Sequence, residues 1–218
     1  MSDFVSMRRT MVDTQLRTNK ITDDRVLAAM ADVPREAFVP ADRAELAYID
    51  EDIEVADGRY LAEPMIFARM VQTLEIDPED EVLDIACGSG YSSAVLGRLA
   101  RAVVAVESIP SLVAAASKSL SAAGQDNVVV EEGPVLAGWA DQAPYDVILI
   151  NGAVEHIPEQ IIDQLADGGR LCAVVRRDGA PGVAQLLIKS RGVVSRRLVF
   201  DASMPNLKEF ELEKGFSF

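Results

Sequence analysis

The spacing of hydrophobic and polar residues changes near residue 80 of this chain. Before that point apolar residues recur at helical spacing, which predicts helices over residues 7–17 and from Thr22 to Val33. Thr22 is expected to cap the second helix, and Pro64 begins a third. Residues 50–63 show no clear period and contain the turn signal Asp57–Gly58. This part of the chain therefore predicts helices joined by loops.

From residue 81 onward short β-branched runs alternate with helical segments. Strands alternating with helices predict a parallel sheet covered on both faces, which is an α/β fold. Near the end, two apolar runs flank Arg191–Gly192 and read as an antiparallel hairpin. The predicted strands span residues 82–86, 102–107, 128–130, 146–150, 171–175, 183–189 and 193–200. One helix is predicted over residues 92–100, and a second begins at residues 108–110. A third runs from Pro158 to about Ala166, and Gly168–Gly169 closes it.

A strand, a tight turn and a helix follow one another around residues 82–96. The turn, Ala86 to Gly90, consists mainly of small residues. Such a turn lets backbone N–H groups approach a ligand and directs a helix N-terminus at it. The next strand ends in Glu107, where an acid is placed to accept hydrogen bonds from ribose hydroxyls. A tight turn that binds no ligand is the alternative.

The spacing in this loop distinguishes between nucleoside ligands. A dinucleotide fold carries G-x-G-x-x-G, which holds a pyrophosphate. Here the pattern is Asp84-x-Ala86-x-Gly88-x-Gly90, with an acid at the end of the strand. That acid would repel a pyrophosphate but suits an ammonium group, such as that of the methionine part of S-adenosylmethionine. The loop therefore predicts S-adenosylmethionine rather than NAD.

Composition restricts the partners that this chain can have. With 218 residues and a net charge of −14, it is one domain's worth of chain and unsuited to non-specific binding of nucleic acid or anionic membranes. Its two cysteines and single histidine suggest neither a disulfide framework nor a metal site. There is no signal-peptide pattern and no run long enough to span a membrane, so a soluble cytoplasmic protein is expected.

Several longer motifs stand beside the cofactor loop, at residues 11–17, 21–30, 33–40, 47–48, 138–139, 143–146 and 164–171. With these motifs the chain resembles the protein-L-isoaspartate O-methyltransferase family of S-adenosylmethionine-dependent enzymes. The resemblance covers nearly the whole chain and weakens after about residue 176. It implies a Rossmann-like class I methyltransferase fold, with a mostly parallel seven-stranded sheet that ends in antiparallel strands. It also implies an N-terminal helical arm with the substrate loop over residues 1–80 and a cofactor domain over 81–218, packed as one compact unit.

The resemblance assigns the cofactor to a defined set of residues. S-adenosylmethionine is expected to bind there, with S-adenosylhomocysteine as the product, and no metal is expected. Glu132 is a candidate for a polar contact with adenine, although an exposed acid at a strand end is the alternative. The candidate cofactor-binding residues are Asp84, Ala86, Cys87, Gly88, Ser89, Gly90, Tyr91, Glu107, Ser108, Glu132 and Gly133.

The chain departs from the family in the loop before the third helix. The family carries Thr-Ile-Ser-x-Pro there, and its serine is assigned to the active site. This chain has Tyr60-Leu61-Ala62-Glu63-Pro64, so the serine position is Ala62 and has no hydroxyl. The family's Gly-Asp-Gly after the third strand is replaced by Gly133-Pro134-Val135.

Four residues remain as candidates for the methyl-transfer site: Ala62, Tyr60, Arg59 and Asn151. Arg59 is placed to pair with a substrate carboxylate, or it is a solvated arginine. Tyr60 fills the acceptor pocket or only packs. Asn151 lies at a strand end, where ligand-facing groups gather, or it is a turn residue before Gly152.

The resemblance implies methyl transfer to an isoaspartyl carboxylate in damaged protein. Such a carboxylate is already ionised at neutral pH, so the lost serine would remove an orienting hydrogen bond rather than a base. Weak or absent isoaspartyl activity beside intact cofactor binding is therefore expected. A methyltransferase with a different acceptor, or a cofactor-binding protein that has lost this activity, is the alternative.

Overall fold

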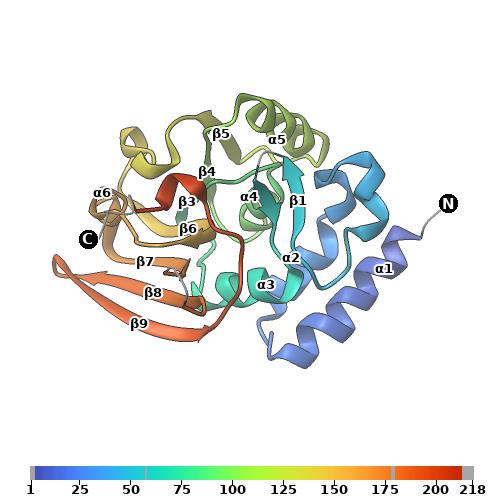
Figure 1. Cartoon of the computed structure of the whole chain (residues 1–218), viewed down its shortest axis with the longest axis horizontal. Coiled ribbons are helices and arrows are strands. Elements are labelled where there is room, and N and C mark those ends of the chain that lie inside the picture. The colour runs from blue at the N-terminus through green and yellow to red at the C-terminus, as the bar shows by residue number, and fades with distance from the viewer. Residues whose placement is uncertain (1–2, 57, 178–179, 213–218) are drawn as a thin grey trace, which may run out of the picture.

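The computed structural model describes residues 3–56, 58–177 and 180–212, and within them seven strands form one sheet (Figure 1). The sheet order is β5-β4-β3-β6-β7-β8-β9. The first five of these strands pair in parallel, whereas β8 pairs antiparallel with both β7 and β9. The strands are β3 (Glu81–Ile85), β4 (Ala102–Glu107), β5 (Val128–Glu132), β6 (Tyr145–Val154), β7 (Leu165–Val175), β8 (Val183–Ser190) and β9 (Val193–Asp201). This architecture confirms the predicted α/β fold with antiparallel end strands.

Helices and short helical turns complete the chain. The α-helices are α1 (Phe4–Met11), α2 (Asp24–Asp32), α3 (Pro64–Thr73), α4 (Tyr91–Gly97), α5 (Pro110–Ala122) and α6 (Glu159–Ile162). A π-helical turn (Val12–Leu16) and a 3₁₀ turn (Arg17–Asn19) extend α1, and further 3₁₀ turns span Arg35–Phe38, Ala41–Leu46, Val135–Ala137, Ala140–Gln142 and Lys208–Phe210. In the described part of the chain, no helix is long and apolar enough to cross a bilayer.

The sheet separates two hydrophobic clusters because successive side chains of a strand point to opposite faces. On one face, Val82, Val103 and Val147 pack with the buried residues of α1 to α4 and of α5. On the other face, Leu83, Val104 and neighbouring strand residues pack against α6 and the C-terminal segment. The predicted N-terminal helical arm is therefore joined to the sheet through a shared core.

The start of α2 differs from the prediction that Thr22 caps it. Asp23 is the N-cap, and its carboxylate accepts hydrogen bonds from the backbone N–H groups of Arg25 (2.8 Å) and Val26 (3.4 Å). The backbone N–H of Thr22 instead donates to the side chain of Gln72 in α3. The cap is thus one residue later than predicted, because an aspartate and a threonine compete for the position and the aspartate reaches the free N–H groups.

A short antiparallel hairpin was not predicted in residues 50–63. It consists of β1 (Ile53–Ala56) and β2 (Arg59–Leu61), and Asp57, half of the predicted turn, lies outside the described residues. Strands of three and four residues are too short to show an alternating pattern. The hairpin lies beside α4 in Figure 1 and leads directly into α3.

The helix predicted from Pro158 to about Ala166 is much shorter in the structure. It ends at Ile162, and Gly168–Gly169, predicted to close it, lies inside β7. The register of β6 and β7 shifts at this point, which marks a bulge. A Cβ at position 169 would lie 3.0 Å from the carbonyl oxygen of Tyr145, so the glycine allows the two backbones to approach.

Candidate functional site

The loop between β3 and α4 has the tight backbone that its small residues predict. Gly88 (φ 56°), Gly90 (φ 93°) and Ala86 (φ 59°) all adopt left-handed conformations. A Cβ at Gly90 would lie 3.1 Å from Cβ of Ala116 in α5 and 3.2 Å from Leu120, so a side chain would be both strained and crowded there. The loop therefore turns sharply beneath α5 at the carboxyl ends of β3 and β4.

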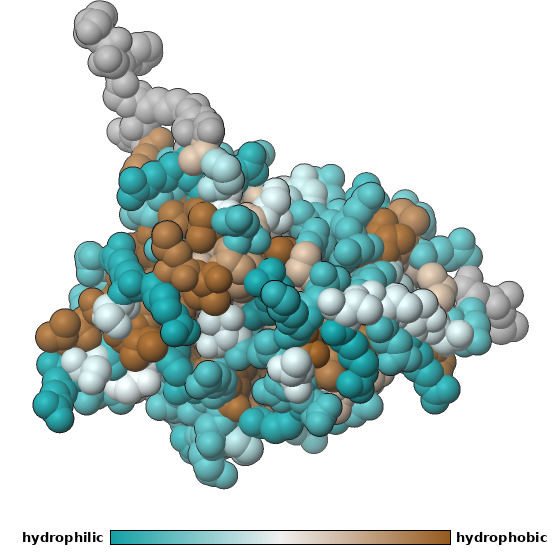
Figure 2. Space-filling view, turned by 90° about the horizontal axis from the view of Figure 1, so that it is seen from below, coloured by the Kyte–Doolittle hydropathy of each residue, from teal (hydrophilic) through white to brown (hydrophobic). Residues whose placement is uncertain are grey.

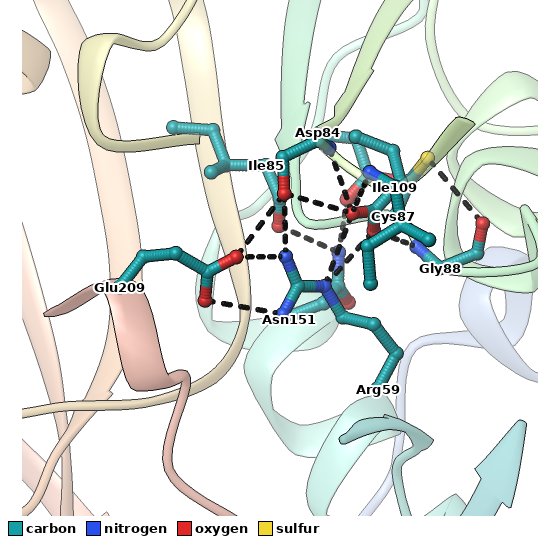
Figure 3. Close-up of polar contacts among 10 residues, drawn as sticks. Arg59, Asp84, Ile85, Cys87, Gly88, Ile109, Asn151 and Glu209 are labelled. Carbon is teal, nitrogen blue, oxygen red and sulfur yellow. Dashed lines mark hydrogen bonds and ion pairs between the residues drawn. The ribbon is translucent and has the colours of Figure 1, made fainter. Parts of the chain in front are cut away.

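Asp84 is buried at the end of β3 and is surrounded by hydrogen-bond donors. Its Oδ2 accepts from the hydroxyls of Ser92 (2.7 Å) and Ser93 (2.6 Å). Its Oδ1 accepts from Nδ2 of Asn151, which lies beside it in Figure 3. Burial raises the pKa of Asp84 to about 6, although these hydrogen bonds act to lower it. Asn151, predicted to line the methyl-transfer site, thus binds the acid of the cofactor loop.

Glu107 is buried at the tip of β4, and its carboxylate is held by the backbone. Its Oε1 accepts from the N–H groups of Ser108 (2.7 Å) and Ile109 (3.1 Å), and its Oε2 accepts from the N–H of Gly88 (3.0 Å). These contacts connect the ends of two neighbouring strands through one side chain. They also fix the carboxylate at the position predicted for ribose binding.

Arg59 occupies the remaining approach to this carboxylate. Its Nε lies 3.0 Å from Oε2 and 3.2 Å from Oε1 of Glu107, and its side chain is 4% exposed (Figure 3). Its terminal nitrogens bind Glu209, with Nη2–Oε1 at 2.6 Å and Nη1–Oε2 at 3.2 Å, and Nη2 also donates to the hydroxyl of Ser108 (3.1 Å). The alternative of a solvated arginine is therefore wrong.

Ion pairing favours the charged forms of Arg59 and Glu209. Burial acts to lower the pKa of Arg59, but hydrogen bonds to Glu209 and Glu107 outweigh it, so that the pKa lies above its ordinary value. Burial acts to raise the pKa of Glu209, but the hydrogen bond to Arg59 outweighs burial, so that this pKa lies below its ordinary value. Arg59 therefore pairs with two carboxylates of its own chain in this structure.

The loop that differs from the family lies against the same site. Ala62 is buried, and its carbonyl oxygen accepts a hydrogen bond from Nη2 of Arg35 (2.5 Å). Tyr60 and Ala62 line a cavity of about 20 Å³ with Cys87, Gly88 and Asn151, which is too small for a nucleoside. The predicted acceptor residues and cofactor loop are thus neighbours, and the space between them is narrow.

The other predicted cofactor residues lie in different surroundings. Ser89 is buried and donates to the carbonyl of Phe38 (2.5 Å), and Tyr91 packs edge-on against Phe38. Burial raises the pKa of the Cys87 thiol well above its ordinary value. Glu132 is exposed, whereas Gly133 lies beside the ring of Trp139, which a Cβ would meet at 2.9 Å.

Two residues of the site were not predicted from the sequence. Arg35 is fully buried, donates from Nε to the carbonyl of Ala47 (2.6 Å), and stacks over the ring of Tyr91 at 4.9 Å. Glu209 comes from the C-terminal 3₁₀ turn. Arg35 lies in residues 33–40, one of the segments that resemble the family, so the resemblance is a signal for it. Glu209 carries no signal, because an acid in a short polar tail is ordinary.

Comparisons with known proteins identify the family. A sequence model of the protein-L-isoaspartate(D-aspartate) O-methyltransferase family (PCMT) matches residues 7–200. The chain belongs to this family. It is 42% identical to the protein-L-isoaspartate O-methyltransferase of Synechococcus sp. over 85% of this chain and 78% of that protein. The enzyme of Koribacter versatilis is 40% identical over 92% of this chain and 90% of its own.

Solved structures agree on the fold. One protein-L-isoaspartate O-methyltransferase superposes with a TM-score of 0.80 and 24% identity, over 92% of this chain and 65% of that chain. A Plasmodium falciparum protein described as a member of the family, in complex with S-adenosyl-L-homocysteine, superposes with a TM-score of 0.81 and 20% identity, over 93% and 98%. The predicted Rossmann-like fold, the family and its S-adenosylmethionine-dependent methyltransferase class are thereby confirmed.

The residues of this chain fit the family's cofactor in kind. Glu107 is held by backbone N–H groups, and Asp84 supplies a second acid at the neighbouring strand end. In the described residues, two cysteines are free and buried, and no group of three or more His, Cys, Asp or Glu side chains is placed to hold a metal. In this conformation, however, Arg59 binds the Glu107 carboxylate where a ribose hydroxyl would donate its hydrogen bond.

Proposed function

We propose that this chain binds S-adenosylmethionine and transfers its methyl group to an isoaspartyl carboxylate in damaged protein. The observation that carries the proposal is the backbone-held Glu107 at the tip of β4, in a chain of the protein-L-isoaspartate O-methyltransferase family. A fixed carboxylate at this strand end suits a ribose, whose hydroxyls are donors.

The cofactor supplies an electrophilic methyl group on a sulfonium. The nucleophile is the acceptor carboxylate, which is ionised at neutral pH and needs no strong general base. The protein's contribution is then to orient the acceptor and exclude water, which the half-buried Tyr60 and the buried Ala62 are placed to do. Without a hydroxyl at position 62, one orienting hydrogen bond is missing, so we expect slow transfer.

A different methyl acceptor is the second candidate, and the acids around the loop favour it. Burial, together with repulsion from Asp50 and Asp52, raises the pKa of Glu63 to about 7. Burial also raises the pKa of Asp52. Carboxylates close to the loop oppose the approach of an anionic acceptor and favour a neutral or cationic one.

The remaining parts of the proposal concern partners and organisation. The proposed partner is a protein or peptide with isoaspartyl residues, with no nucleic acid or membrane, in the cytoplasm. Relatives with about 40% identity carry the name of this enzyme, and the net charge of −14 disfavours polyanionic partners. We further propose that residues 1–80 serve as arm and substrate loop for the cofactor domain.

Calorimetry with S-adenosylhomocysteine tests the cofactor half of the proposal. The unaltered protein should bind, and Glu107→Ala should largely abolish the heat because the ribose acceptor is lost. Asp126→Ala is the matched control, since Asp126 is an exposed acid that precedes β5, away from the strand ends that carry Glu107. No heat with the unaltered protein, or equal loss in the control, would contradict the proposed cofactor site.

Transfer from labelled S-adenosylmethionine to an isoaspartyl peptide tests the acceptor half. The same peptide with ordinary aspartate is the control. Weak label on the isoaspartyl peptide alone supports the proposal. Label on neither peptide, from a protein that binds the cofactor, would favour the different acceptor or a loss of catalysis.

A further inference from the structure

Arg59 and a ribose require the same position on Glu107. A carboxylate offers about four lone-pair positions. The backbone N–H groups of Ser108 and Ile109 bind Oε1, where the Ser108 hydroxyl also donates at 3.4 Å, and the N–H of Gly88 binds Oε2. Nε of Arg59 takes the position that remains, 3.0 Å from Oε2 and 3.2 Å from Oε1. In the described part of the chain, this leaves Glu107 without a free acceptor for a ligand hydroxyl.

We propose that Arg59 is an internal competitor of the nucleoside ligand, and that the ligand displaces it from Glu107 while Glu209 retains it. This inference rests on the proposed cofactor site. It adds that cofactor affinity is set by the exchange of a guanidinium for ribose hydroxyls on one carboxylate. Arg59 is thus an affinity-determining residue rather than a catalytic one.

The two carboxylates that hold Arg59 differ in a way that suits such an exchange. Glu107 is fully buried and fixed by the backbone, so it stays in place to receive the ligand. The Glu209 side chain is 31% exposed, lies in a short 3₁₀ turn near the C-terminus, and binds two nitrogens of Arg59. A displaced guanidinium therefore keeps a bidentate partner and is not left as an unpaired buried charge.

Displacement of Arg59 also reaches the acceptor loop. Arg59 begins β2 and directly precedes Tyr60, whose neighbour Leu61 pairs with Ile53 across the hairpin. Figure 3 shows Arg59 extending from the hairpin toward the strand ends, with Glu209 approaching from the opposite side. The proposed displacement therefore takes place next to the segment that carries Tyr60 and Ala62.

The alternative is that Arg59 is a permanent structural partner of Glu107. In that case its removal leaves a buried carboxylate unpaired, disorders the strand ends and weakens ligand binding. Removal of Glu209 would also weaken ligand binding. If Arg59 is a competitor, its removal strengthens ligand binding and the removal of Glu209 weakens it, and this difference can be measured.

The experiment is calorimetric titration of S-adenosylhomocysteine into the unaltered protein, Arg59→Met and Glu209→Gln. Arg59→Met should bind roughly tenfold more tightly or better, since no hydrogen bond to a charged group must be broken. Glu209→Gln should bind more weakly, because the displaced arginine loses its charged partner. Arg170→Met is the matched control. It removes a partly buried ion pair with Asp80, which precedes β3 at the end of the strand opposite to the cofactor loop, and it should leave the affinity unchanged.

Thermal unfolding without ligand provides a readout that is independent of binding. Arg59→Met should unfold at a lower temperature than the unaltered protein but gain a larger rise on adding ligand. If Arg59→Met does not fold, Arg59→Gln takes its place, because its neutral amide binds a carboxylate less strongly than a guanidinium does, and it should also bind the ligand more tightly.

The outcomes separate this inference from the proposed function. Unaltered protein that binds, together with a folded Arg59 variant that binds equally or more weakly, overturns the competitor role and leaves the cofactor site standing. Absence of binding in the unaltered protein and in every Arg59 variant overturns both. Opposite shifts for Arg59→Met and Glu209→Gln support the competitor role.

Discussion

At the scale of single residues, the two acids of the site have different surroundings although they lie at neighbouring strand ends. Asp84 is bound by side-chain donors and has a pKa raised by burial, whereas Glu107 is bound by backbone N–H groups and an arginine. Their positions follow from the loop spacing, so the sequence predicts both. Their partners Asn151 and Arg59 are distant in sequence, and no local pattern indicates those contacts.

Asp84 should make stability fall as pH rises, contrary to most carboxylates. Its pKa is about 6 in the folded chain against 3.8 as the ordinary value, so the folded state holds the proton more tightly. Its contribution is complete below pH 4 and is lost as pH rises through about 6. The loss is roughly 3 kcal/mol, because each pKa unit corresponds to about 1.4 kcal/mol.

Urea unfolding of the unaltered protein and Asp84→Asn from pH 4 to 7 measures this contribution. The difference in unfolding free energy between the two should drift by that amount in favour of the variant as pH rises. The drift, rather than the offset at one pH, isolates the titration, because the variant also alters the hydrogen bonds with Ser92 and Ser93. A constant difference would show that Asp84 does not titrate in this window.

At the scale of elements, long periodic segments are predictable and short ones are not. The strands from β3 to β9 and the start of α3 at Pro64 agree with the sequence pattern within a few residues, except that β7 begins at Leu165, six residues before the predicted start at 171. The hairpin of β1 and β2 was missed, and α6 was predicted too long, because a short strand lacks a period and a glycine pair allows a bulge as readily as a helix end. The missed hairpin is the element that carries Arg59.

The loop after this hairpin should limit methyl transfer. Ala62→Ser with Tyr60→Thr restores both hydroxyls and reduces the bulk at the cavity. Each hydrogen bond to a charged acceptor is worth about 1.5–3 kcal/mol, or roughly one to two orders of magnitude in rate if it forms mainly in the transition state. Transfer to an isoaspartyl peptide, measured with labelled cofactor, should rise accordingly.

Tyr60→Phe is the matched control for this loop. It keeps the bulk of the ring without adding a small hydroxyl, so it should give no increase in transfer. Rapid turnover by the unaltered protein, with no gain from the double substitution, would show that neither hydroxyl is needed.

At the scale of the whole molecule, the C-terminal segment returns across the sheet and completes the site. The backbone N–H of Leu207 donates to the carbonyl of Ala153 (2.8 Å), and Ala153 in turn donates to Pro205 (2.9 Å). In Figure 1 this segment runs from β9 over the sheet to end near α6. It brings Glu209 to Arg59, a contact across the length of the chain that no sequence pattern predicts.

The surface seen from below carries its apolar side chains in separate patches. Figure 2 shows apolar patches broken up by hydrophilic side chains. Leu198 of β9 is 68% exposed, whereas Leu207 is 3% exposed. Apolar contacts that stabilise the C-terminal segment are therefore made inside the molecule.

Leu207 should anchor that segment. Its side chain covers Gly152, where a Cβ would lie 2.6 Å from Cγ of Leu207, so the two residues fill one space. Leu207→Ala leaves a cavity and should cost about 2–4 kcal/mol of unfolding free energy, measured in urea. Leu198→Ala removes the same atoms from an exposed position and should change stability by less than about 0.5 kcal/mol. Equal losses in the two variants would mean that the segment is not held at Leu207, and Glu209 would then lack the support that keeps it on Arg59.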